Sequence, residues 1–591
     1  MTAKVYTLIL AILLSATVAS AQRKLAPKPK LNTGNEQHKV NPKEAGFKVS
    51  ENKLHIPTVR TSLFAFYFTD TDVSTIYDLQ SNAVPNQIWQ DPLNPSKVHA
   101  ACMYSLEPGF PTRKCAYLYS DNGGQTWTNL FDVPSSGRSG FPSISGFPDY
   151  IGGSPAIIAN HNTTNGTTAR TKVNIDAGPG FGVFTEIDPG LLQGADGVWP
   201  RVLGITGNRV VIVTSVSGQV VSATNVATSI VPPGVFSGYQ TYPGDQAETY
   251  SLSLAPNGTV GHAFIGANDG INNNDVFFRN STDGGISWSA PVLVWDFSEA
   301  TDSLGCLRGV SMVYGNNNEP YVAFNIGLMT LAGNFDPAGP SSIRVWSPAV
   351  NGGIPKIIAD QSSVPFFPNL GLTNDAFIPI CRPAIGKSSN GNNLFVSFVA
   401  TTGEYSPVDT CSYYAGWFAN STDNGTNWFA PDRFTPATPL RDWRFISISQ
   451  TSNSEPGYVS VRMIALSDSL AGSHVNGAQI GTGKFISIKA EILFSVNQIG
   501  NSVPDGFDLY NNYPNPFNPS TKITFDIPKN SNVKLTVFDY LGKEIKTLVN
   551  ENLSSGKYET EFNAEGLSSG VYFYRLETDG AAITKSMVLL K

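Results

Sequence analysis

The stretch Ser281-Thr-Asp-Gly-Gly-Ile-Ser-Trp288 decides the fold, because the chain repeats it twice. Ser120-Asp-Asn-Gly-Gly-Gln-Thr-Trp127 and Ser421-Thr-Asp-Asn-Gly-Thr-Asn-Trp428 keep its serine, glycine and tryptophan in register. Each copy follows a run that ends in aromatic residues and precedes a second strand-like run. In such a turn Asp or Asn accepts backbone hydrogen bonds, Gly takes a positive φ and Trp packs on the neighbouring layer. The repeats therefore predict three equivalent hairpins in an all-β chain.

The repeated segments resemble the Asp box, or BNR repeat, of sialidase-like β-propellers. The matching positions are Ser120, Asn122, Gly124, Trp127, Ser281, Asp283, Gly285, Trp288, Ser421, Asp423, Gly425 and Trp428. Asn122 stands where that repeat has an aspartate. We interpret all of these residues as structural, with the tryptophans packing the hairpins and not serving as platforms for sugars.

The boxes begin at residues 120, 281 and 421, so they are much further apart than one propeller blade of about 40 to 75 residues. A second recurring strand predicts the blades between them. Innermost strands are expected near Gln87–Trp89 and at Ser154–Ile158, Trp199–Leu203, Tyr250–Leu254, Arg308–Met312, Arg382–Ile385 and Trp443–Ile446.

We predict an all-β propeller of six to eight blades, with seven favoured, over residues 57–495. Either residues 57–84 or the end near Ile488 would supply the strand that closes the ring. A parallel β-helix or a pair of β-sandwiches is the structural alternative.

The C-terminal region predicts a second, smaller domain. Asn512-Tyr-Pro-Asn-Pro-Phe-Asn-Pro-Ser-Thr521 is too rich in proline to continue a helix or a strand ladder, and short alternating strands follow it. We predict a small Ig-like β-sandwich over residues 509–591. This proline motif, the turn at 539–542 and Leu567-Ser-Ser-Gly-Val-Tyr-Phe573 resemble the type A C-terminal sorting domain of the type IX secretion system. The resemblance implies that residues 509–591 contact the secretion machinery.

The N-terminus predicts export as well. Lys4 precedes an apolar run, and Ala19-Ser20-Ala21 is a small-residue cleavage site before Gln22. We therefore expect a signal peptide at 1–21, a flexible leader at 22–56 and, further on, a linker at 496–508. No transmembrane segment is expected, because no apolar run is long enough. The protein is predicted to be secreted or displayed at the outer-membrane surface.

Composition excludes few partners. A net charge of −7 on 591 residues argues against nucleic acid. No phosphate-binding loop and no metal-ligand spacing is present, so we expect neither cofactor nor metal. Cys102 and Cys115 fall on two strands joined by a turn near Pro108. Symmetric pairing would make a disulfide between them possible, and buried free thiols are the alternative.

The resemblance to sialidases implies a tyrosine nucleophile paired with a glutamate, an acid/base aspartate and three arginines that clamp a carboxylate. The first of these arginines belongs to a Phe/Tyr-Arg-Ile-Pro motif, and its nearest match here, Leu54-His55-Ile56-Pro57, has histidine in its place. A neutral imidazole cannot form the two-pronged contact. Glu248 and Tyr250 offer a Glu/Tyr pair, at a spacing that is common in proteins. No catalytic residue is assigned.

Four arginines form the candidate ligand site. Aligning the expected inner strands puts Arg308 and Arg382 at one position and Arg201 and Arg444 two residues further on, on the same strand face. Such a cluster would attract a carboxylated or sulfated glycan. Alternatively, each arginine pairs with a nearby carboxylate such as Glu248, Asp360 or Asp442 and ties the blades together.

The sequence thus favours a secreted propeller that binds an extracellular polymer, either a glycan or a protein. The alternative is a glycoside hydrolase of the sialidase-like superfamily that acts on an anionic glycan. Another enzyme, such as a lyase or a peptidase, is a third hypothesis. Function depends on the site that a fold carries and not on the fold itself.

Overall fold

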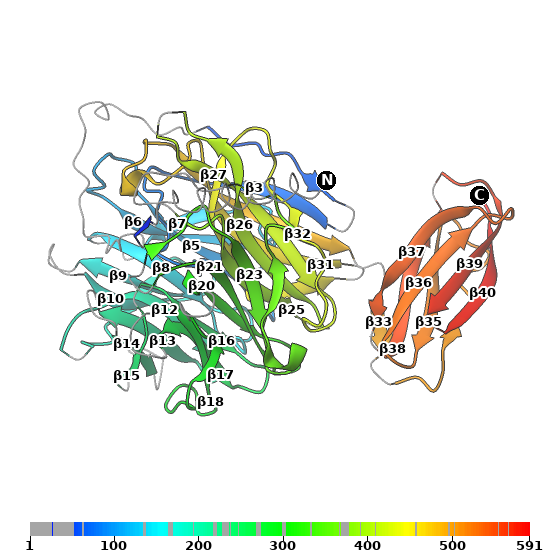
Figure 1. The fold of residues 1–591 in the computed structure, drawn as a ribbon, viewed down its shortest axis with the longest axis horizontal. Helices are drawn as coiled ribbons and strands as arrows, with labels where there is room; N and C mark the ends of the chain where they lie inside the picture. Colours follow the sequence, from blue (N-terminus) through cyan, green and yellow to red (C-terminus); the bar gives the residue numbers. More distant parts are fainter. Residues whose placement is uncertain are drawn as a thin grey trace, which may run out of the picture.

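The computed structural model describes residues 26–27 and 52–591 apart from short internal stretches, the longest being 164–168, 217–220, 227–235, 268–273, 298–302 and 368–376. The predicted signal peptide and most of the predicted leader lie outside these residues. In the described part the chain is all-β, with only two short 3-10 turns, η1 (Asn351–Gly353) and η2 (His474–Asn476). A large body contains the strands up to β32, and a small body contains the C-terminal strands (Figure 1).

Five separate four-stranded antiparallel sheets follow one another through the large body, each with its strands in sequence order. Their strands are β4 (Ile88–Gln90), β5 (Val98–Tyr104), β6 (Lys114–Ser120) and β7 (Thr128–Asp132); β8 (Ser139–Ser145), β9 (Ile157–Thr163), β10 (Ala169–Asp176) and β11 (Phe184–Ile187); β12 (Gly197–Ile205), β13 (Arg209–Val216), β14 (Val221–Val226) and β15 (Gln240–Pro243); β16 (Tyr250–Leu254), β17 (Val260–Gly266), β18 (Asp275–Ser281) and β19 (Val292–Trp295); β20 (Leu304–Tyr314), β21 (Pro320–Leu328), β23 (Ser341–Trp346) and β24 (Lys356–Ala359).

A ten-stranded sheet combines two more units of the same kind. The first unit consists of β25 (Ile380–Ser388), β26 (Leu394–Tyr405), β27 (Ser412–Ser421) and β28 (Asp432–Arg433). The second consists of β29 (Asp442–Ile448), β31 (Tyr458–Asp468), β32 (Gly483–Leu493) and β3 (Phe64–Thr75). β30 (Thr451–Glu455) joins the two units, and β2 (Val59–Arg60) extends the second. A separate short ladder pairs β1 (Ala26–Pro27) with β22 (Asn334–Phe335).

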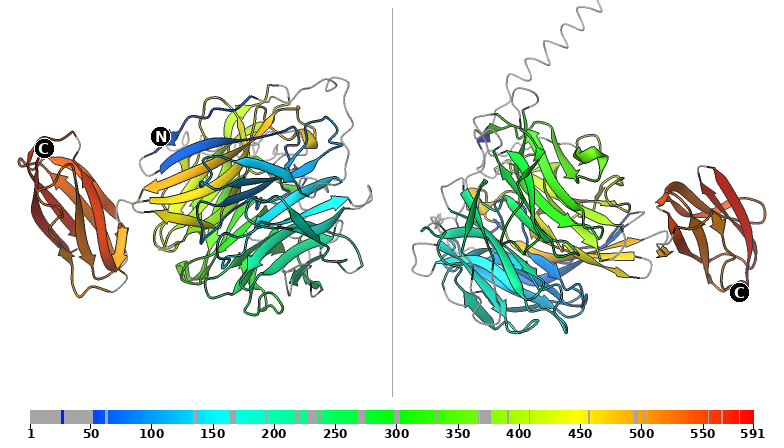
Figure 2. Two further views of the ribbon diagram at one scale, coloured as in Figure 1. Left: turned by 180° about the vertical axis from the view of Figure 1, so that it is seen from behind. Right: turned by 90° about the horizontal axis from the view of Figure 1, so that it is seen from below.

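The last unit is completed by a strand from the beginning of the chain. β3 runs antiparallel to β32, with Phe64 opposite Ile492, and Figure 2 shows this blue strand beside the late strands of the body. Both segments predicted to close the ring therefore take part in the closure. The small antiparallel sheets are consistent with the blades of a propeller, in which such a junction ties the two chain ends together.

The first strand of five units carries the same bulge. Phe141, Trp199, Arg308, Arg382 and Phe445 have φ between 53° and 54°, and the pairing with the second strand shifts at each of them. A bulky residue rarely adopts a positive φ, and a bulge bends the strand. The recurrence of this strain at one place identifies these strands as equivalent.

Serine hydroxyls on the first strands connect neighbouring units. Ser143 Oγ accepts a hydrogen bond from Val202 N at 3.0 Å, and Ser447 Oγ accepts one from Gln87 N at 2.9 Å. The same type of bond is formed by Ser145, Ser251, Ser253, Ser311 and Ser449. These bonds satisfy N–H groups on the one edge of each sheet that faces the centre.

The three boxes form the turns from β6 to β7, from β18 to β19 and from β27 to β28, which are the third and fourth strands of three different units. In each box the serine Oγ accepts a hydrogen bond from the glycine N, and the tryptophan Nε1 donates one to the same glycine's carbonyl. The predicted hairpins are confirmed.

One predicted inner strand is wrong. The segment expected at Ser154–Ile158 runs into β9, the second strand of its unit, and β8 is the first. β8 contains Phe141-Pro142, a bulky residue followed by proline, like Trp199-Pro200 in β12. The pattern of the inner strand was therefore present one strand earlier than predicted.

The possible disulfide between Cys102 and Cys115 is not formed, and all five cysteines are buried free thiols. In the register of β5 and β6, Cys102 lies opposite Ala116, and Met103 lies opposite Cys115. Successive side chains of a strand point to opposite faces of a sheet, so the two thiols lie on different faces. The connecting turn is asymmetric, which shifts the register by one residue from the predicted one.

The C-terminal strands form two four-stranded sheets. The first contains β33 (Asn497–Gly500), β38 (Gly556–Asn563), β35 (Ser520–Ile527) and β34 (Asp508–Leu509), and the second contains β37 (Glu544–Leu553), β36 (Ser531–Phe538), β39 (Gly570–Thr578) and β40 (Ala581–Leu589). Both sheets contribute to one buried core that includes Phe525, Leu535 and Tyr574. The segment predicted as a linker at 496–508 thus supplies β33 to this domain.

No helix of the described chain combines the length and the apolar character needed to cross a membrane.

Candidate functional site: the two mouths of the central channel

The first strands of all seven units line one common pocket, and we call the space between these strands the central channel. The direction of the strands gives the channel two different mouths. Each first, or inner, strand ends at the turn that leads to the second strand of its unit, and we call this end of the channel the funnel mouth. The loops that lead into the inner strands lie at the other end, which we call the plugged mouth. The boxes, as turns from third to fourth strands, are on the funnel side.

Residues 76–87, which we call the plug, connect β3 to β4 and fill the plugged mouth. Residues 76 to 85 are all buried. Asp78 accepts hydrogen bonds from Ser473 Oγ at 2.7 Å and from His474 N at 2.5 Å. Gln80 Nε2 donates to Met103 O at 2.9 Å. The plug is therefore fastened both to the neighbouring strand β5 and to a loop 395 residues further along the chain.

Arg201 fastens the middle of the plug. Its Nη1 lies 2.7 Å from Glu248 Oε1, and its Nη2 donates to Val84 O at 2.5 Å. Glu248 Oε2 accepts hydrogen bonds from Ser81 Oγ at 2.9 Å and from Asn82 N at 2.7 Å. The side chains of Arg201 and Glu248 are only 4% and 1% exposed. Arg201 therefore pairs with a nearby carboxylate, which is the alternative to ligand binding that the sequence left open.

Arg444 is paired in the same way. Its Nε lies 2.5 Å from Asp442 Oδ2, and its guanidinium lies 5.0 Å from the centre of the Tyr414 ring. The other Asp442 oxygen accepts from Tyr414 N at 2.8 Å. Asp360, a further partner considered from the sequence, instead accepts from Ser362 N within a turn.

Arg308 and Arg382 are buried in the wall of the channel, with 6% and 2% exposure. The guanidinium of Arg382 lies between two rings, 3.8 Å from the centre of Phe377 and 4.5 Å from that of Phe445. Burial lowers the pKa of Arg308 to about 10, and the charge of Arg382 adds to this effect while Asp245 opposes it. The four arginines are thus enclosed by the protein and do not line an open site.

The Glu248 and Tyr250 pair is also committed to the fold. The Tyr250 hydroxyl donates to Trp199 O at 2.6 Å, and burial raises the pKa of this phenol above its ordinary value. His55, at the position of the expected first arginine, is exposed. The neighbouring Leu54 N donates to Asp70 Oδ2 of β3, so His55 lies at the outer edge of the last unit.

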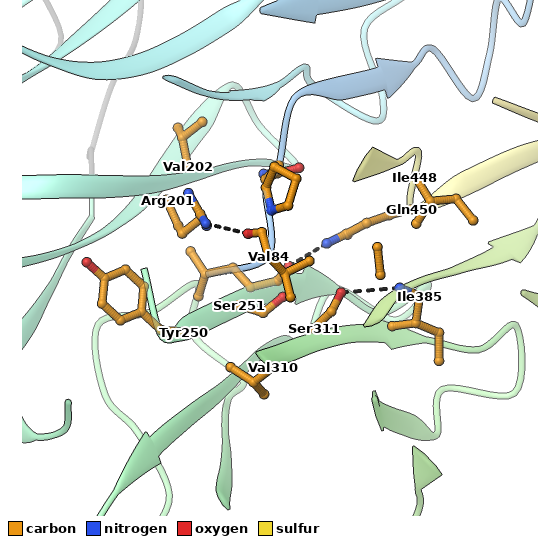
Figure 3. A pocket seen from close by; sticks show the side chains of 14 residues that line it. Val84, Arg201, Val202, Tyr250, Ser251, Val310, Ser311, Ile385, Ile448 and Gln450 are labelled. Atoms are coloured by element: carbon orange, nitrogen blue, oxygen red, sulfur yellow. Dashed lines mark hydrogen bonds between the residues drawn. The ribbon is translucent and has the colours of Figure 1, made fainter. Parts of the chain in front are cut away.

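A cavity of about 20 Å³ separates the plug from the rest of the channel. Figure 3 shows Val84, Arg201, Ser311 and Gln450 around it. This volume holds about one water molecule. Gln450 closes its far side, because its Nε2 donates to Leu252 O at 2.6 Å.

Beyond Gln450 the channel widens into a pocket of about 420 Å³, which we call the funnel. The ends of the first strands of all seven units line it, through residues such as Trp89, Gly146, Gly204, Ala255, Asn316 and Lys387. Asn86, Val202 and Gln450 line both the funnel and the small cavity, so they form its floor. The funnel is a blind pocket within the size range of small-molecule sites, about 300–1,000 Å³.

Lys387, near the end of β25, places an amino group in the funnel wall. The residue is 8% exposed, and its Nζ donates to Asn316 Oδ1 at 2.8 Å. Burial lowers the pKa of Lys387 to about 8. Of the described lining residues, only Lys387 and Asp149 are charged. Asp149 is exposed at the rim, where it accepts from Gly207 N at 3.1 Å.

The remaining wall is largely apolar. Trp89, Pro92, Pro148 and Pro256 line the funnel, and Tyr150 stands beside the rim with 39% exposure. Rigid apolar surfaces with a few polar groups are typical of ligand sites. Among the described residues, no group of three or more His, Cys, Asp or Glu side chains could hold a metal ion.

Sequence reasoning missed Lys387, although a signal was present. The recurring bulge puts Arg382 level with Trp199 and Phe445, so Lys387, five residues further on, is level with Gly204 and Gln450. Two long polar side chains therefore occur where another inner strand has glycine. The predicted alignment groups Arg382 with Trp199, but it misplaces Arg444, because the bulge of β29 puts this residue one position before Arg382 and not two positions after it.

Comparison with known families identifies the small domain. Residues 511–590 match the family model of the secretion system C-terminal sorting domain. The chain therefore carries a type IX sorting domain, and the protein is secreted or displayed at the cell surface, as the sequence predicts. No curated protein matches the chain in sequence.

Solved structures that resemble the chain include several carbohydrate-active enzymes. The polysaccharide lyase Uly1 is 8% identical, with a TM-score of 0.36, over 80% of this chain and 97% of that one. The α-L-arabinofuranosidase Arb93A from Fusarium graminearum is 11% identical, with a TM-score of 0.34, over 69% and 92% of the two chains. The exo-β-1,3-galactanase from Phanerochaete chrysosporium is 10% identical, with a TM-score of 0.27, over 85% and 99%. Similarities this weak do not identify an activity.

Proposed function

We propose that this protein is a secreted binding module that takes an extracellular polymer into the funnel of a seven-bladed, sialidase-like propeller. The funnel is the observation that carries the proposal. It gathers the strand ends of all seven units around about 420 Å³, whereas the plug fills the opposite mouth. The sialidase-like assignment rests on the three boxes and their shared hydrogen bonds.

Binding is favoured over hydrolysis by the chemistry of the lining. Most glycosidases need two carboxyl groups on either side of the scissile bond. The described lining of the funnel contains one carboxylate, Asp149, which is exposed and accepts a backbone hydrogen bond. The residues that resemble sialidase chemistry, Tyr250 and the arginines, are buried at the other end of the channel.

The test is to fill the funnel from a position that the fold does not need. Thr206 lines the funnel and is exposed, so Thr206→Trp should block it without disturbing the core. The matched control is Thr185→Trp, on the outer strand β11, where the side chain is also exposed.

Binding of the full secreted chain would be measured by calorimetry against polygalacturonate, dextran sulfate, neutral xylan and gelatin. We expect at least one polymer to bind, Thr206→Trp to abolish this binding and Thr185→Trp to retain it. Binding that survives Thr206→Trp would contradict the funnel as the site. Release of reducing sugar from a polymer, or of sialic acid from a fluorogenic sialoside, would favour the glycoside hydrolase instead.

A further inference from the structure

The amino group of Lys387 differs from the other buried lysines of the large body. Lys172 lies 2.7 Å from Asp188 Oδ2, with 8% of its side chain exposed. Lys484 lies 3.6 Å from Asp70 Oδ2, with 5% exposed. Each of these charges is balanced by a carboxylate.

Lys387 is buried to the same degree, but its polar contact among the described residues is the neutral amide of Asn316. An ammonium group has three N–H donors, and Asn316 accepts one of them. Burying a charge without a counter-charge is unfavourable. The cost is removed when an anion binds next to the amine.

The floor of the funnel determines which part of a polymer can reach Lys387. Gln450 is bonded across the channel to Leu252 O at 2.6 Å, so a chain cannot pass through. Only an end of a chain, or a group that projects from it, can enter a blind pocket of this size.

The wall favours a glycan over a peptide. Extended peptides commonly bind by pairing with the free edge of a sheet, and the funnel presents the ends of strands and not their edges. Trp89 and the lining prolines supply flat apolar surfaces, while Asn316, Ser389 and Thr451 supply polar groups between them.

We propose that Lys387 binds an anionic group, a carboxylate or a sulfate, at the end of an acidic glycan chain in the funnel. This inference rests on the proposed function and names the class of its ligand. The anionic group accepts the N–H donors of Lys387 that Asn316 leaves available, and sugar rings behind it contact Trp89.

The test uses three variants of the full chain and three probes of equal length. Lys387→Met removes the charge and keeps the length of the side chain, and Lys387→Arg restores a cation. Lys97→Met is the control, because Lys97 lies on the same side of the body and donates to Gly152 O at 2.9 Å without lining the funnel. The probes are an oligogalacturonate, its neutral methyl ester and a sulfated oligosaccharide.

We expect Lys387→Met to weaken binding of an acidic probe by about tenfold or more, since charge-assisted hydrogen bonds are strong. Lys387→Arg should recover part of the loss, and Lys97→Met should bind as the unmodified protein does. The acidic probe that loses affinity identifies the group as carboxylate or sulfate. The methyl ester should bind weakly to all variants.

Equal affinity of Lys387→Met and the unmodified protein for both acidic probes would overturn the inference. If Thr206→Trp still abolished that binding, the funnel would remain the site and only the role of Lys387 would be wrong. Failure of both acidic probes to bind the unmodified protein would also overturn the inference, while binding of neutral xylan in the funnel would leave the proposed function intact.

Discussion

The two mouths of the channel are built from opposite ends of the same strands, but they treat buried charge differently. At the plugged mouth, Arg201 and Arg444 each contact a carboxylate at 2.7 Å or less, and the plug fills the remaining space. At the funnel mouth, Lys387 is buried against a neutral amide beside a pocket of about 420 Å³. The number of cations at an end of the channel is thus a poor guide to its function. The partners of each cation are the better guide.

The largest effect is expected on stability, when the carboxylate that pairs with a buried arginine at the plugged mouth loses its charge. Glu248→Gln leaves Arg201 buried without its counter-charge, which should lower the free energy of unfolding by about 3–5 kcal/mol. Thermal and urea unfolding of the full chain would measure the change, and affinity for polymers should be unaltered below the transition.

Arg170→Ala is the matched control for this prediction. Arg170 also contacts two carboxylates, Asp188 and Asp196, but its side chain is 32% exposed. Pairs of this kind contribute about 1 kcal/mol or less. If Glu248→Gln cost no more than Arg170→Ala, the buried pair would not be what holds the plug.

The second-largest effect is expected in the pH dependence of ligand binding in the funnel. Burial lowers the pKa of Lys387 from 10.5 to about 8, so above pH 8 the free protein loses the proton that an anion needs. Affinity for an acidic probe should fall above that value, by at most about tenfold per pH unit, until it reaches the affinity of Lys387→Met. Asp149 is the only other charged lining residue described.

The lowered pKa of Lys387 changes stability with pH in the direction opposite to its effect on binding. The unfolded chain holds the Lys387 proton up to about pH 10.5, whereas the folded chain releases it near pH 8. Between these values the unfolded state binds more protons, so the contribution of this group to stability rises with pH. Titrations of binding and of unfolding between pH 7 and 10, compared with Lys387→Met, would separate the two effects. A pH profile of binding that Lys387→Met does not flatten would contradict the assignment.

The smallest effect is expected far from both mouths, in the boxes. Asp283 Oδ1 accepts hydrogen bonds from Ile286 N at 3.0 Å and from Ser287 N at 2.9 Å. Asp283→Ala should lower stability by about 1 kcal/mol and leave binding unchanged. Asp283→Asn should recover much of this loss, because Asn122 accepts from Thr126 N at 3.0 Å in the first box. A loss of affinity in Asp283→Ala would give the box a role in binding.

The sequence predicts the parts of this fold that depend on local chemistry. The boxes, most of the inner strands and the small domain follow from turn residues, alternation and proline within short segments. It does not predict the plug, because Ser81 and Glu248, whose side chains bond to each other, are 167 residues apart. The residue that lies opposite Cys102 depends on the shape of the turn between β5 and β6. A shift of the register by a single residue moves a side chain to the other face of the sheet.

The four arginines predicted as the candidate ligand site are buried away from the funnel in which we propose that the ligand binds. Arg308 and Arg382 do occupy the same bulge position, but Arg201 follows the bulge of β12 and Arg444 precedes that of β29, so the predicted equivalence of the last two is wrong. The alternative of carboxylate partners describes Arg201 and Arg444. Lys387 could have been found by extending the same alignment to the strand ends. Its lack of a carboxylate partner among the described residues depends on three-dimensional packing around Asn316 and Gln450.

Hydroxyl-radical footprinting of the full chain, with and without a polymer that binds, tests most directly whether the ligand occupies the funnel mouth. Trp89 and Tyr150 report on the funnel, and Leu106, Phe367 and Leu440, with 48%, 36% and 40% exposure, lie in loops on the plugged side. We predict that the polymer protects Trp89 and Tyr150 from oxidation and leaves the other three unchanged. Protection of Leu106, Phe367 and Leu440 with unchanged oxidation of Trp89 would contradict the account.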